Sequence, residues 1–242
     1  MREEERKRVE EILQKGGRKL GVAFSFSQIK DFCIYLEELK KWNKGFNLTG
    51  IKEDKDIISK HFLDSLSCEM VMENFDGKMI DIGTGAGFPS LPLKIHRPQL
   101  SLTLVDSNQN KIIFLNRLIS TLKLKEVRIV RARAEDFAKY NERENYDYAV
   151  CRALAKLRVT LEYTLPFLKI RGYLIAQRGN AAEEEIKESR KALSILGGEA
   201  KEIIRFKLPI TRERRVLVKI KKIESTPLKY PRRVGIPLKR PL

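Results

Sequence analysis

The feature that most constrains the fold is an alternation that begins near residue 78. Short apolar or β-branched runs are expected to form strands at KMIDIG, LSLTLVD, VRIVRAR, YDYAVCRA and GYLIAQRG, and helical segments follow most of them. Such alternation gives a parallel sheet covered on both faces by right-handed crossovers. Two final strands, AKEIIRFKL and RRVLVKIKKI, have no helix between them and are expected to pair antiparallel at one edge. The sequence therefore predicts an α/β fold with a mostly parallel sheet.

Residues 1–75 are predicted to form an N-terminal helical extension packed on this core. In SQIKDFCIYLEELKKWNKGF, apolar residues recur at steps of three and four, with Ser27 as the expected N-cap and Gly45 as the stop. DKDIISKHFLDSLSCEMVM repeats the pattern. EEERKRVEEILQ has too few apolar residues for a central core helix, so it is expected at the surface.

The last segment has a different composition from the rest. Residues 219–242 contain eight basic residues, one acid and four prolines, which exclude a regular helix or a central strand. Two interpretations stay open: a solvated, disordered end, or an arm along an RNA backbone in which Tyr230 stacks on a base. The expected division is thus an extension at 1–75, a core at 76–222 and a basic tail at 223–242.

The charge of the chain favours a polyanionic partner. Lys and Arg total 49 against 32 acidic residues, a net charge of +17. A heat-adapted surface would explain many charges of both signs, but it would not explain the imbalance. RNA or DNA is the expected partner, and the charge alone does not choose between them.

Several classes of protein are disfavoured by what the sequence omits. The charged start MREEERKRVEEILQK has no apolar signal region, and no apolar run is long enough to span a bilayer. Cys33, Cys68 and Cys151 are widely spaced and odd in number, which implies neither a disulfide framework nor a CxxC metal site. His61 and His96 are too few and too separated for a metal site. We expect a cytoplasmic protein with no membrane partner, and a monomer because no exposed apolar helix suggests an obligate dimer.

The stretch MIDIGTGAGFPSLPLKI is predicted to bind a nucleotide at the end of the first core strand. Gly83, Gly85 and Gly87 allow a sharp turn and close approach to a ligand. No Lys follows before residue 94, which disfavours a P-loop. The spacing is GxGxG, and Phe88 stands where a dinucleotide fold has its third glycine. A phosphate would also be repelled by Asp81.

S-adenosylmethionine (AdoMet) fits this loop better because it carries an ammonium and a sulfonium and no phosphate. Asp81 suits a cationic group. Asp106 ends the second strand, where an acid can accept hydrogen bonds from both ribose hydroxyls. The same residue is also a possible N-cap of the helix that follows, which is compatible with ribose binding.

Seven segments form a pattern: NLTGI (47–51), HFLDSL (61–66), DIGTGAGFPSLPL (81–93), LVDSNQNKIIFL (104–115), ARAED (132–136), CRALAKL (151–157) and YPRRVGIPLKRPL (230–242). Together they resemble the bacterial 16S rRNA guanine-N7 methyltransferases (RsmG, formerly glucose-inhibited division protein B). The resemblance runs from about Trp42 to the C-terminus. Three departures are Ser90 in the loop, Cys151 before the Arg-Ala pair, and DSNQNK after the second strand.

The resemblance implies a Rossmann-like class I methyltransferase with a seven-stranded sheet, AdoMet as methyl donor, and 16S rRNA or the small ribosomal subunit as partner. By position it implies a set of residues around the cofactor. Together with the loop argument, the expected cofactor-binding residues are Asp81, Gly83, Gly85, Gly87, Phe88, Asp106, Ser107, Asn108, Ala134, Glu135 and Arg152.

Methyl transfer to guanine N7 needs no general base, because this nitrogen carries a free lone pair at neutral pH. Alignment and desolvation can supply most of the catalysis. The sequence lacks a [DN]PP[FY] motif for exocyclic amines and a Pro-Cys setting for cytosine C5. No catalytic residue is assigned; the positioning candidates are Arg152, Asn47, His61 and Asp64. For His61 and Asp64, a helix–sheet hydrogen bond is favoured over direct catalysis.

N7 lies in the deep major groove of an RNA helix, so the target guanine must be unpaired or extruded. Arg131 and Arg152 are candidates for phosphate or base-edge contacts. Two other functions stay open: methylation of another RNA base, and a non-catalytic RNA-binding or ribosome-assembly role on the same fold.

Overall fold

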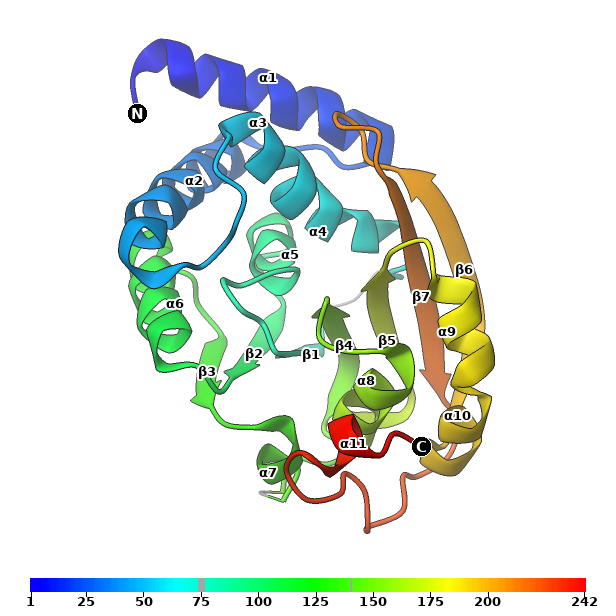
Figure 1. The fold of residues 1–242 in the computed structure, drawn as a ribbon. Helices are drawn as coiled ribbons and strands as arrows, with labels where there is room; N and C mark the ends of the chain where they lie inside the picture. Colours follow the sequence, from blue (N-terminus) through cyan, green and yellow to red (C-terminus); the bar gives the residue numbers. More distant parts are fainter. Residues whose placement is uncertain (74–76, 140) are drawn as a thin grey trace.

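The computed structural model describes residues 1–73, 77–139 and 141–242, and its centre is one seven-stranded sheet (Figure 1). The strand order is β3-β2-β1-β4-β5-β7-β6. The strands are β1 (Lys78–Ile82), β2 (Ser101–Asp106), β3 (Val127–Arg131), β4 (Tyr146–Arg152), β5 (Leu168–Arg178), β6 (Gly198–Lys207) and β7 (Arg214–Lys222). Strands β1 to β5 pair in parallel. The predicted α/β class, strand number and mostly parallel sheet are confirmed.

The last two strands pair antiparallel, as predicted, but the final strand does not form the edge. β7 inserts between β5 and β6 and runs antiparallel to both, with Gln177 opposite Leu217 and Ile203 opposite Val218. Burial explains this order, because β7 carries a run of buried apolar residues, whereas most of β6 is charged and exposed or half-buried. A charged strand is tolerated at an edge, where it resists pairing with other chains.

One face of the sheet is covered by the N-terminal helices and the first two crossovers. These are α1 (Glu3–Leu20), α2 (Phe26–Phe46), α5 (Ser90–His96) and α6 (Gln109–Leu122), together with a continuous helical segment made of α3 (Asp54–Ile57), the π-helix η1 (Ile58–Leu63), α4 (Asp64–Leu66) and the 3-10 turn η2 (Ser67–Met70). Their apolar side chains share one core with Met79, Leu104 and Val150 of the sheet. The extension is therefore packed on the core, and α1 lies at the surface as predicted.

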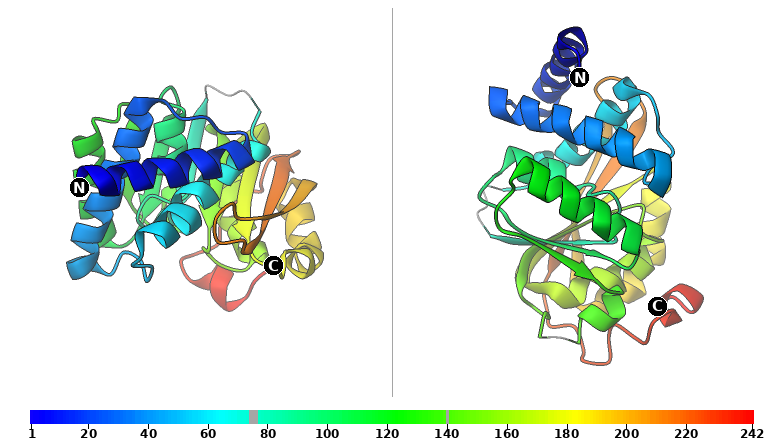
Figure 2. Two further views of the ribbon diagram at one scale, coloured as in Figure 1. Left: turned by 90° about the horizontal axis from the view of Figure 1, so that it is seen from above. Right: turned by 90° about the vertical axis from the view of Figure 1, so that its left-hand side faces the viewer.

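The opposite face is covered by the later helices and by the end of the chain. They are α7 (Ala134–Phe137), α8 (Leu157–Thr164) with the turn η3 (Leu165–Phe167), α9 (Ala182–Glu188), α10 (Arg190–Leu196) and α11 (Ile236–Lys239). Their core includes Ile82, Ala149 and Val218 of the sheet and Tyr230 of the tail. The N-terminal helices and the tail lie at opposite ends of the molecule (Figure 2).

Helix ends differ from the sequence expectations where local hydrogen bonds decide them. α2 begins after Ser25, not Ser27, because the Ser25 hydroxyl accepts from the Gln28 N–H while the Gln28 side chain accepts from the Ser25 N–H. It ends at Asn47, in the left-handed conformation with φ 48°, rather than at Gly45. The expected boundary between residues 75 and 76 lies outside the described residues.

The basic tail is ordered on the core, so the interpretation as a disordered end is wrong. Arg143 donates from Nη1 to the Tyr230 carbonyl (2.5 Å) and from Nη2 to the Thr226 carbonyl (2.7 Å). Arg232 forms a bidentate ion pair with the fully buried Glu162. The Tyr230 ring is itself buried, so it does not offer a face for stacking on a base.

The position for a ligand site in this sheet is the point where the strand order reverses, beside β1. β1 is followed along the chain by β2 on one side, and β4 lies on its other side. The crossovers around this point diverge, which leaves a crevice at the carboxyl ends of the strands. The turn after β1 and the ends of β2 and β4 therefore border one region.

Candidate functional site

The turn after β1 needs glycine at two positions for steric reasons. Gly83 has φ +71°, and a Cβ added there would lie 2.5 Å from Leu154 Cδ1. Gly87 has φ +96°, and a Cβ would lie 2.4 Å from Leu91 Cδ1. Gly85 also has a positive φ, +63°, but no atom lies closer than 4.0 Å to its Cβ position. Gly85 is therefore required for conformation and is open to added volume.

A cavity of about 280 Å³ lies at the carboxyl ends of β1 to β4. We call it the cofactor cavity. Its lining is Ile82, Gly83, Val105, Asp106, Ser107, Lys111, Ala132, Arg133, Ala134, Glu135, Ala153, Leu154, Tyr163 and Leu238. Five predicted cofactor residues are thus brought together: Gly83, Asp106, Ser107, Ala134 and Glu135.

Asp106 ties the glycine turn to the second strand. Its Oδ2 accepts from the Gly85 N–H (2.9 Å), and its Oδ1 accepts from the Asn108 N–H (2.9 Å). Lys111 Nζ lies 3.5 Å from Oδ2. The N-cap of α6 is Asn108, whose side chain accepts from the Asn110 and Lys111 N–H groups, so the cap role considered for Asp106 belongs to Asn108.

Asp81 is fully buried at the end of β1, just before the glycine turn. The Ser90 hydroxyl donates to Oδ2 at 2.5 Å, while Oδ1 accepts no hydrogen bond within the described residues. Burial raises the pKa of Asp81 to about 7, against the opposing effect of the Ser90 hydrogen bond. Its unpaired oxygen is suited to a cationic donor, since a buried acceptor without a partner is costly.

The C-terminal tail forms part of the rim of the cofactor cavity, which the sequence did not predict. Glu135 Oε1 accepts from the Gly235 N–H at 3.1 Å, and Leu238 lines the cavity. Tyr163, from α8, also lines it, and burial raises the pKa of that phenol. The tail's composition and its YPRRVGIPLKRPL motif were informative in the sequence, but its path was not, because a Pro-rich segment has no periodic signal.

A second cavity of about 590 Å³ adjoins the first, and both are lined by Ala153. We call it the acceptor cavity. It is lined by Ile51, Lys60, His61, Asp64, Arg152, Ala153, Gln177, Arg178, Gly179, Glu185, Glu213 and Arg215. Ala153 has φ 50°, a conformation that an alanine adopts at some cost, at the wall between the two cavities.

Arg152 organises the helical side of the acceptor cavity. It donates from Nη1 to the Lys60 carbonyl (2.9 Å) and from Nη2 to His61 Nδ1 (3.0 Å). Because an arginine is always a donor, His61 carries its proton on Nε2, which lies 2.7 Å from Thr49 Oγ1. Burial, with the nearby Arg152 charge, lowers the pKa of His61 to about 3, so the ring is neutral.

Phe88 lies beneath this group rather than in the cofactor cavity. Its ring stacks on His61 on one side (4.5 Å between centroids, 15°) and on Tyr35 on the other (5.2 Å, 2°). The Arg152 guanidinium carbon is 5.0 Å from its centroid. The Tyr35 hydroxyl donates to the Ala86 carbonyl at 2.6 Å. These contacts couple the glycine turn to the acceptor cavity.

Asp64 is a buried carboxylate between two arginines. Its Oδ2 lies 3.5 Å from Arg152 Nη1 and 3.4 Å from Arg215 Nε, while Oδ1 has no partner in the described chain. Burial raises the pKa of Asp64, against the opposing charges of Arg152 and Arg215. Gln177 donates to the Asp64 carbonyl (2.5 Å), and its own Oε1 is unpaired within the same residues.

The remaining predicted residues lie around these cavities without lining the cofactor cavity. Asn47 is exposed and ends α2, and its neighbour Thr49 reaches His61. Arg131 ends β3 and is exposed. Thr49, Gln177 and Arg215 were missed: Thr49 stood in the NLTGI motif without a role, and the other two lie in strands whose side-chain directions depend on the register.

Comparison with known proteins gives a consistent result over nearly the whole chain. Residues 28–217 match the family model described as GidB, rRNA small subunit methyltransferase G. The chain is 46% identical over 236 residues to a ribosomal RNA small subunit methyltransferase G of Alkaliphilus oremlandii, covering 97% of this chain and 99% of that protein. It is 44% identical to the protein of that description in Acetivibrio thermocellus, with 99% of each chain covered.

Solved structures share the fold at low identity. A SAM-dependent methyltransferase from Aquifex aeolicus matches with a TM-score of 0.54 and 16% identity, over 69% of this chain and 93% of that one. M. jannaschii TYW2, crystallised with AdoMet, matches with a TM-score of 0.50 and 19% identity, over 63% and 72%. Within the described residues, no helix could span a membrane, and no group of His, Cys, Asp and Glu could hold a metal ion.

Proposed function

Because the chain belongs to the rRNA small subunit methyltransferase G family, we propose that it transfers the methyl group of AdoMet to N7 of a guanine in 16S rRNA. The observation that carries the chemistry is the pair of adjoining cavities that share Ala153. One has the features of a nucleoside site, and the other presents polar groups to a base. AdoMet supplies an electrophilic methyl group when it is bound.

The cofactor cavity would hold the adenosine part of AdoMet, and the methionine part would extend toward Asp81, which lies outside the cavity lining. Asp106 would accept hydrogen bonds from the ribose, and Ala134 and Glu135 would flank the adenine. The unpaired Oδ1 of Asp81 would be satisfied by the ammonium group. Lys111 lies close to the glycine turn, but it comes from α6 and pairs with Asp106, whereas a P-loop lysine directly follows the glycines of its own loop.

The acceptor cavity would hold the extruded guanine. Asp64 Oδ1 and Gln177 Oε1 are unpaired acceptors in the described structure, and guanine offers N–H donors on its Watson–Crick edge. The neutral His61 and the guanidinium of Arg152, which both rest on the Phe88 ring, would position the base. N7 keeps its lone pair without a base, so these residues need only to align the acceptor and exclude water.

The function is tested by incubating the protein with labelled AdoMet and small-subunit rRNA that lacks N7 methylation. After digestion to nucleosides, the label is expected in 7-methylguanosine. Label in another nucleoside would favour methylation of a different base. Absence of AdoMet binding would favour a non-catalytic RNA-binding role.

The pKa of Asp81 gives a pH-dependent test of its contact with the cofactor. With a pKa of about 7, the free carboxyl group is mostly protonated at pH 6 and ionised at pH 8. An ammonium ion stabilises the carboxylate, so AdoMet binding should release close to one proton at pH 6, where the amine of the free cofactor is already protonated; at pH 8 this release should be absent and any exchange should be uptake by that amine. Calorimetry in buffers of different ionisation enthalpy measures this release. In Asp81→Asn the release should vanish; an unchanged release would contradict the contact.

A further inference from the structure

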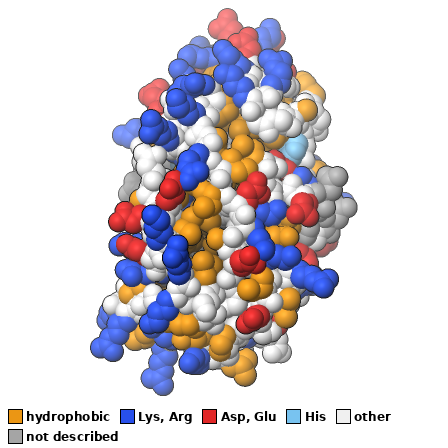
Figure 3. Space-filling view, turned by 90° about the vertical axis from the view of Figure 1, so that its right-hand side faces the viewer, with side chains coloured by type: hydrophobic (Ala, Val, Ile, Leu, Met, Phe, Trp, Pro, Cys, Tyr) orange, Lys and Arg blue, Asp and Glu red, His pale blue; other side chains and the backbone are white. Residues whose placement is uncertain are grey.

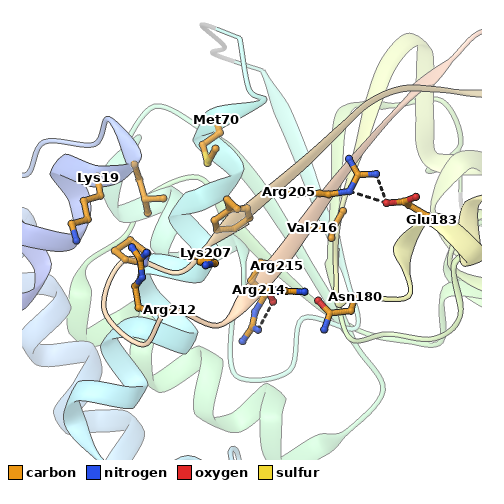
Figure 4. A pocket seen from close by; sticks show the side chains of 13 residues that line it. Lys19, Met70, Asn180, Glu183, Arg205, Lys207, Arg212, Arg214, Arg215 and Val216 are labelled. Atoms are coloured by element: carbon orange, nitrogen blue, oxygen red, sulfur yellow. Dashed lines mark hydrogen bonds and ion pairs between the residues drawn. The ribbon is translucent and has the colours of Figure 1, made fainter.

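A basic groove leads away from the acceptor cavity along the β6–β7 edge of the molecule (Figure 4). It has a volume of about 810 Å³. It is lined by Lys19, Leu20, Met70, Asn180, Glu183, Arg205, Phe206, Lys207, Pro209, Arg212, Arg214, Arg215 and Val216. Six of these side chains are cationic and one is acidic, so the groove is far more positive than the chain as a whole.

The groove and the acceptor cavity meet at Arg215, which lines both. Arg215 faces Asp64 in the acceptor cavity (Nε to Oδ2, 3.4 Å) and Glu213 at its rim (Nη2 to Oε2, 2.8 Å). The cofactor cavity, the acceptor cavity and the groove are thus neighbours in that order, each sharing one lining residue with the next. A strand that delivers a base to the acceptor cavity can leave along the groove.

The cations of the groove are largely free to bind a ligand. Lys19, Lys207, Arg212 and Arg214 are exposed and form no ion pair with any part of the chain that the structure describes. Arg205 pairs with Glu183, but both side chains are more than half exposed. An exposed pair of this kind contributes little, so a phosphate can replace Glu183.

The groove is lined by apolar side chains as well as by cations. Leu20, Phe206 and Pro209 line it, and Phe206 also packs against the main core. Figure 3 shows this side of the molecule, where a strip of hydrophobic side chains is bordered by Lys and Arg side chains with some Asp and Glu side chains among them. Cations beside an apolar and aromatic surface are the arrangement that binds single-stranded nucleic acid, with the backbone on the cations and the bases on the apolar surface.

We propose that this basic groove binds the sugar-phosphate backbone of a single-stranded RNA segment that flanks the target guanine. The inference rests on the proposed function for the identity of the RNA. It assigns Lys19, Arg205, Lys207, Arg212 and Arg214 to phosphate contacts. Arg212 supports the assignment independently, because it holds a left-handed φ of 64° in the β6–β7 turn, where glycine would be less strained.

Two double variants distinguish the effect of the groove cations on RNA binding from the effect of losing surface charge elsewhere. The groove variant is Lys207→Gln with Arg212→Gly, in which the glycine suits the left-handed position. The control is Lys125→Gln with Lys123→Gly. Lys123 also has a positive φ (52°), ends α6 beside the opposite edge strand β3, and like Lys125 is exposed. Each variant therefore loses two surface cations and replaces one residue of positive φ with glycine, which adopts that conformation without strain.

Filter binding to unmodified small-subunit rRNA tests the groove without methyl transfer. The groove variant should bind about tenfold more weakly, and its slope of log K against log salt should fall by about two, near one for each phosphate contact removed. The control variant should keep the wild-type slope. The wild type, the groove variant and the control variant should bind AdoMet with the same affinity. Equal RNA binding by the two variants would overturn the proposal. So would a defect seen with assembled subunits but not with naked rRNA, since that indicates a protein partner.

Methylation kinetics then distinguish failure of the proposed function from failure of the groove proposal. In the groove variant, KM for RNA should rise by about the factor measured in binding, with kcat unchanged at saturating RNA. If the wild type binds RNA through the groove but transfers no methyl group, the proposed function fails and the groove stands. If the wild type methylates RNA and the groove variant has an unchanged KM, the function stands and the groove proposal fails.

Discussion

Gly85→Asp should abolish AdoMet binding, with affinity reduced by at least about a hundredfold, since it adds a second carboxylate on the residue that hydrogen-bonds Asp106, and like charges repel strongly in a partly buried site. The Gly85 N–H donates to Asp106 Oδ2, so the new carboxylate would stand beside that acid. It would also compete for Lys111, whose Nζ lies 4.0 Å from the Cβ position. Both effects should displace Asp106 from the ribose-binding geometry.

Gly85→Asn is the matched control for this variant. Asparagine has nearly the same volume, carries no charge and tolerates a positive φ as well as aspartate does. Isothermal calorimetry should show a loss of less than about tenfold in AdoMet affinity for this variant, since only the charge term is absent. Equal losses in both variants would mean that volume, not charge, matters at Gly85. Unchanged AdoMet affinity in Gly85→Asp would show that the turn at Gly85 is not part of the cofactor site.

Arg232→Met should strongly destabilise the protein. Glu162 is fully buried, and Arg232 gives it a backbone N–H bond (2.8 Å) and three side-chain bonds (2.9, 3.2 and 2.6 Å). Removing the guanidinium leaves the buried carboxylate without its charge partner and with only the backbone N–H bond from residue 232, which costs about 3 kcal/mol. For a chain of this length, Tm should fall by roughly 10 °C. The neighbouring Arg233 is exposed and serves as the control in Arg233→Met, which should be nearly neutral.

The same substitution should weaken cofactor binding, because the pair holds the tail at the cavity rim. Gly235 and Leu238 follow Arg232 closely and contact Glu135 and the cofactor cavity. AdoMet affinity measured well below the new Tm should therefore fall in Arg232→Met and not in Arg233→Met. A variant with lowered Tm and unchanged affinity would show that the tail is only structural.

Much of the fold could be predicted from local patterns. The strands and helices of the core have clear periodicity, and the glycine turn with Asp81 and Asp106 predicts a cofactor site from composition and order alone. The insertion of β7 between β5 and β6 could not be predicted, because two antiparallel strands can pair with a sheet in either order. Only the burial of β7 against both neighbours decides it.

The acceptor side could be predicted only in part, because it depends on contacts between distant segments. His61, Asp64 and Arg152 were expected as positioning residues, and the structure joins them to Phe88, Thr49 and Arg215. These partners are separated by up to about 150 residues, so no spacing reveals them. The tail was missed as part of the cofactor rim for the same reason, since its contacts with Glu135 and Glu162 are tertiary.

RNA that contains guanosine analogues shows directly whether guanine N7 is the methyl acceptor. Small-subunit rRNA is transcribed with guanosine, with 7-deazaguanosine or with inosine, and offered both naked and as reconstituted subunits with labelled AdoMet. N7 is absent from the first analogue, and the exocyclic amine is absent from the second. We expect label in guanosine and inosine RNA and none in 7-deazaguanosine RNA. Equal label in 7-deazaguanosine RNA would contradict this expectation.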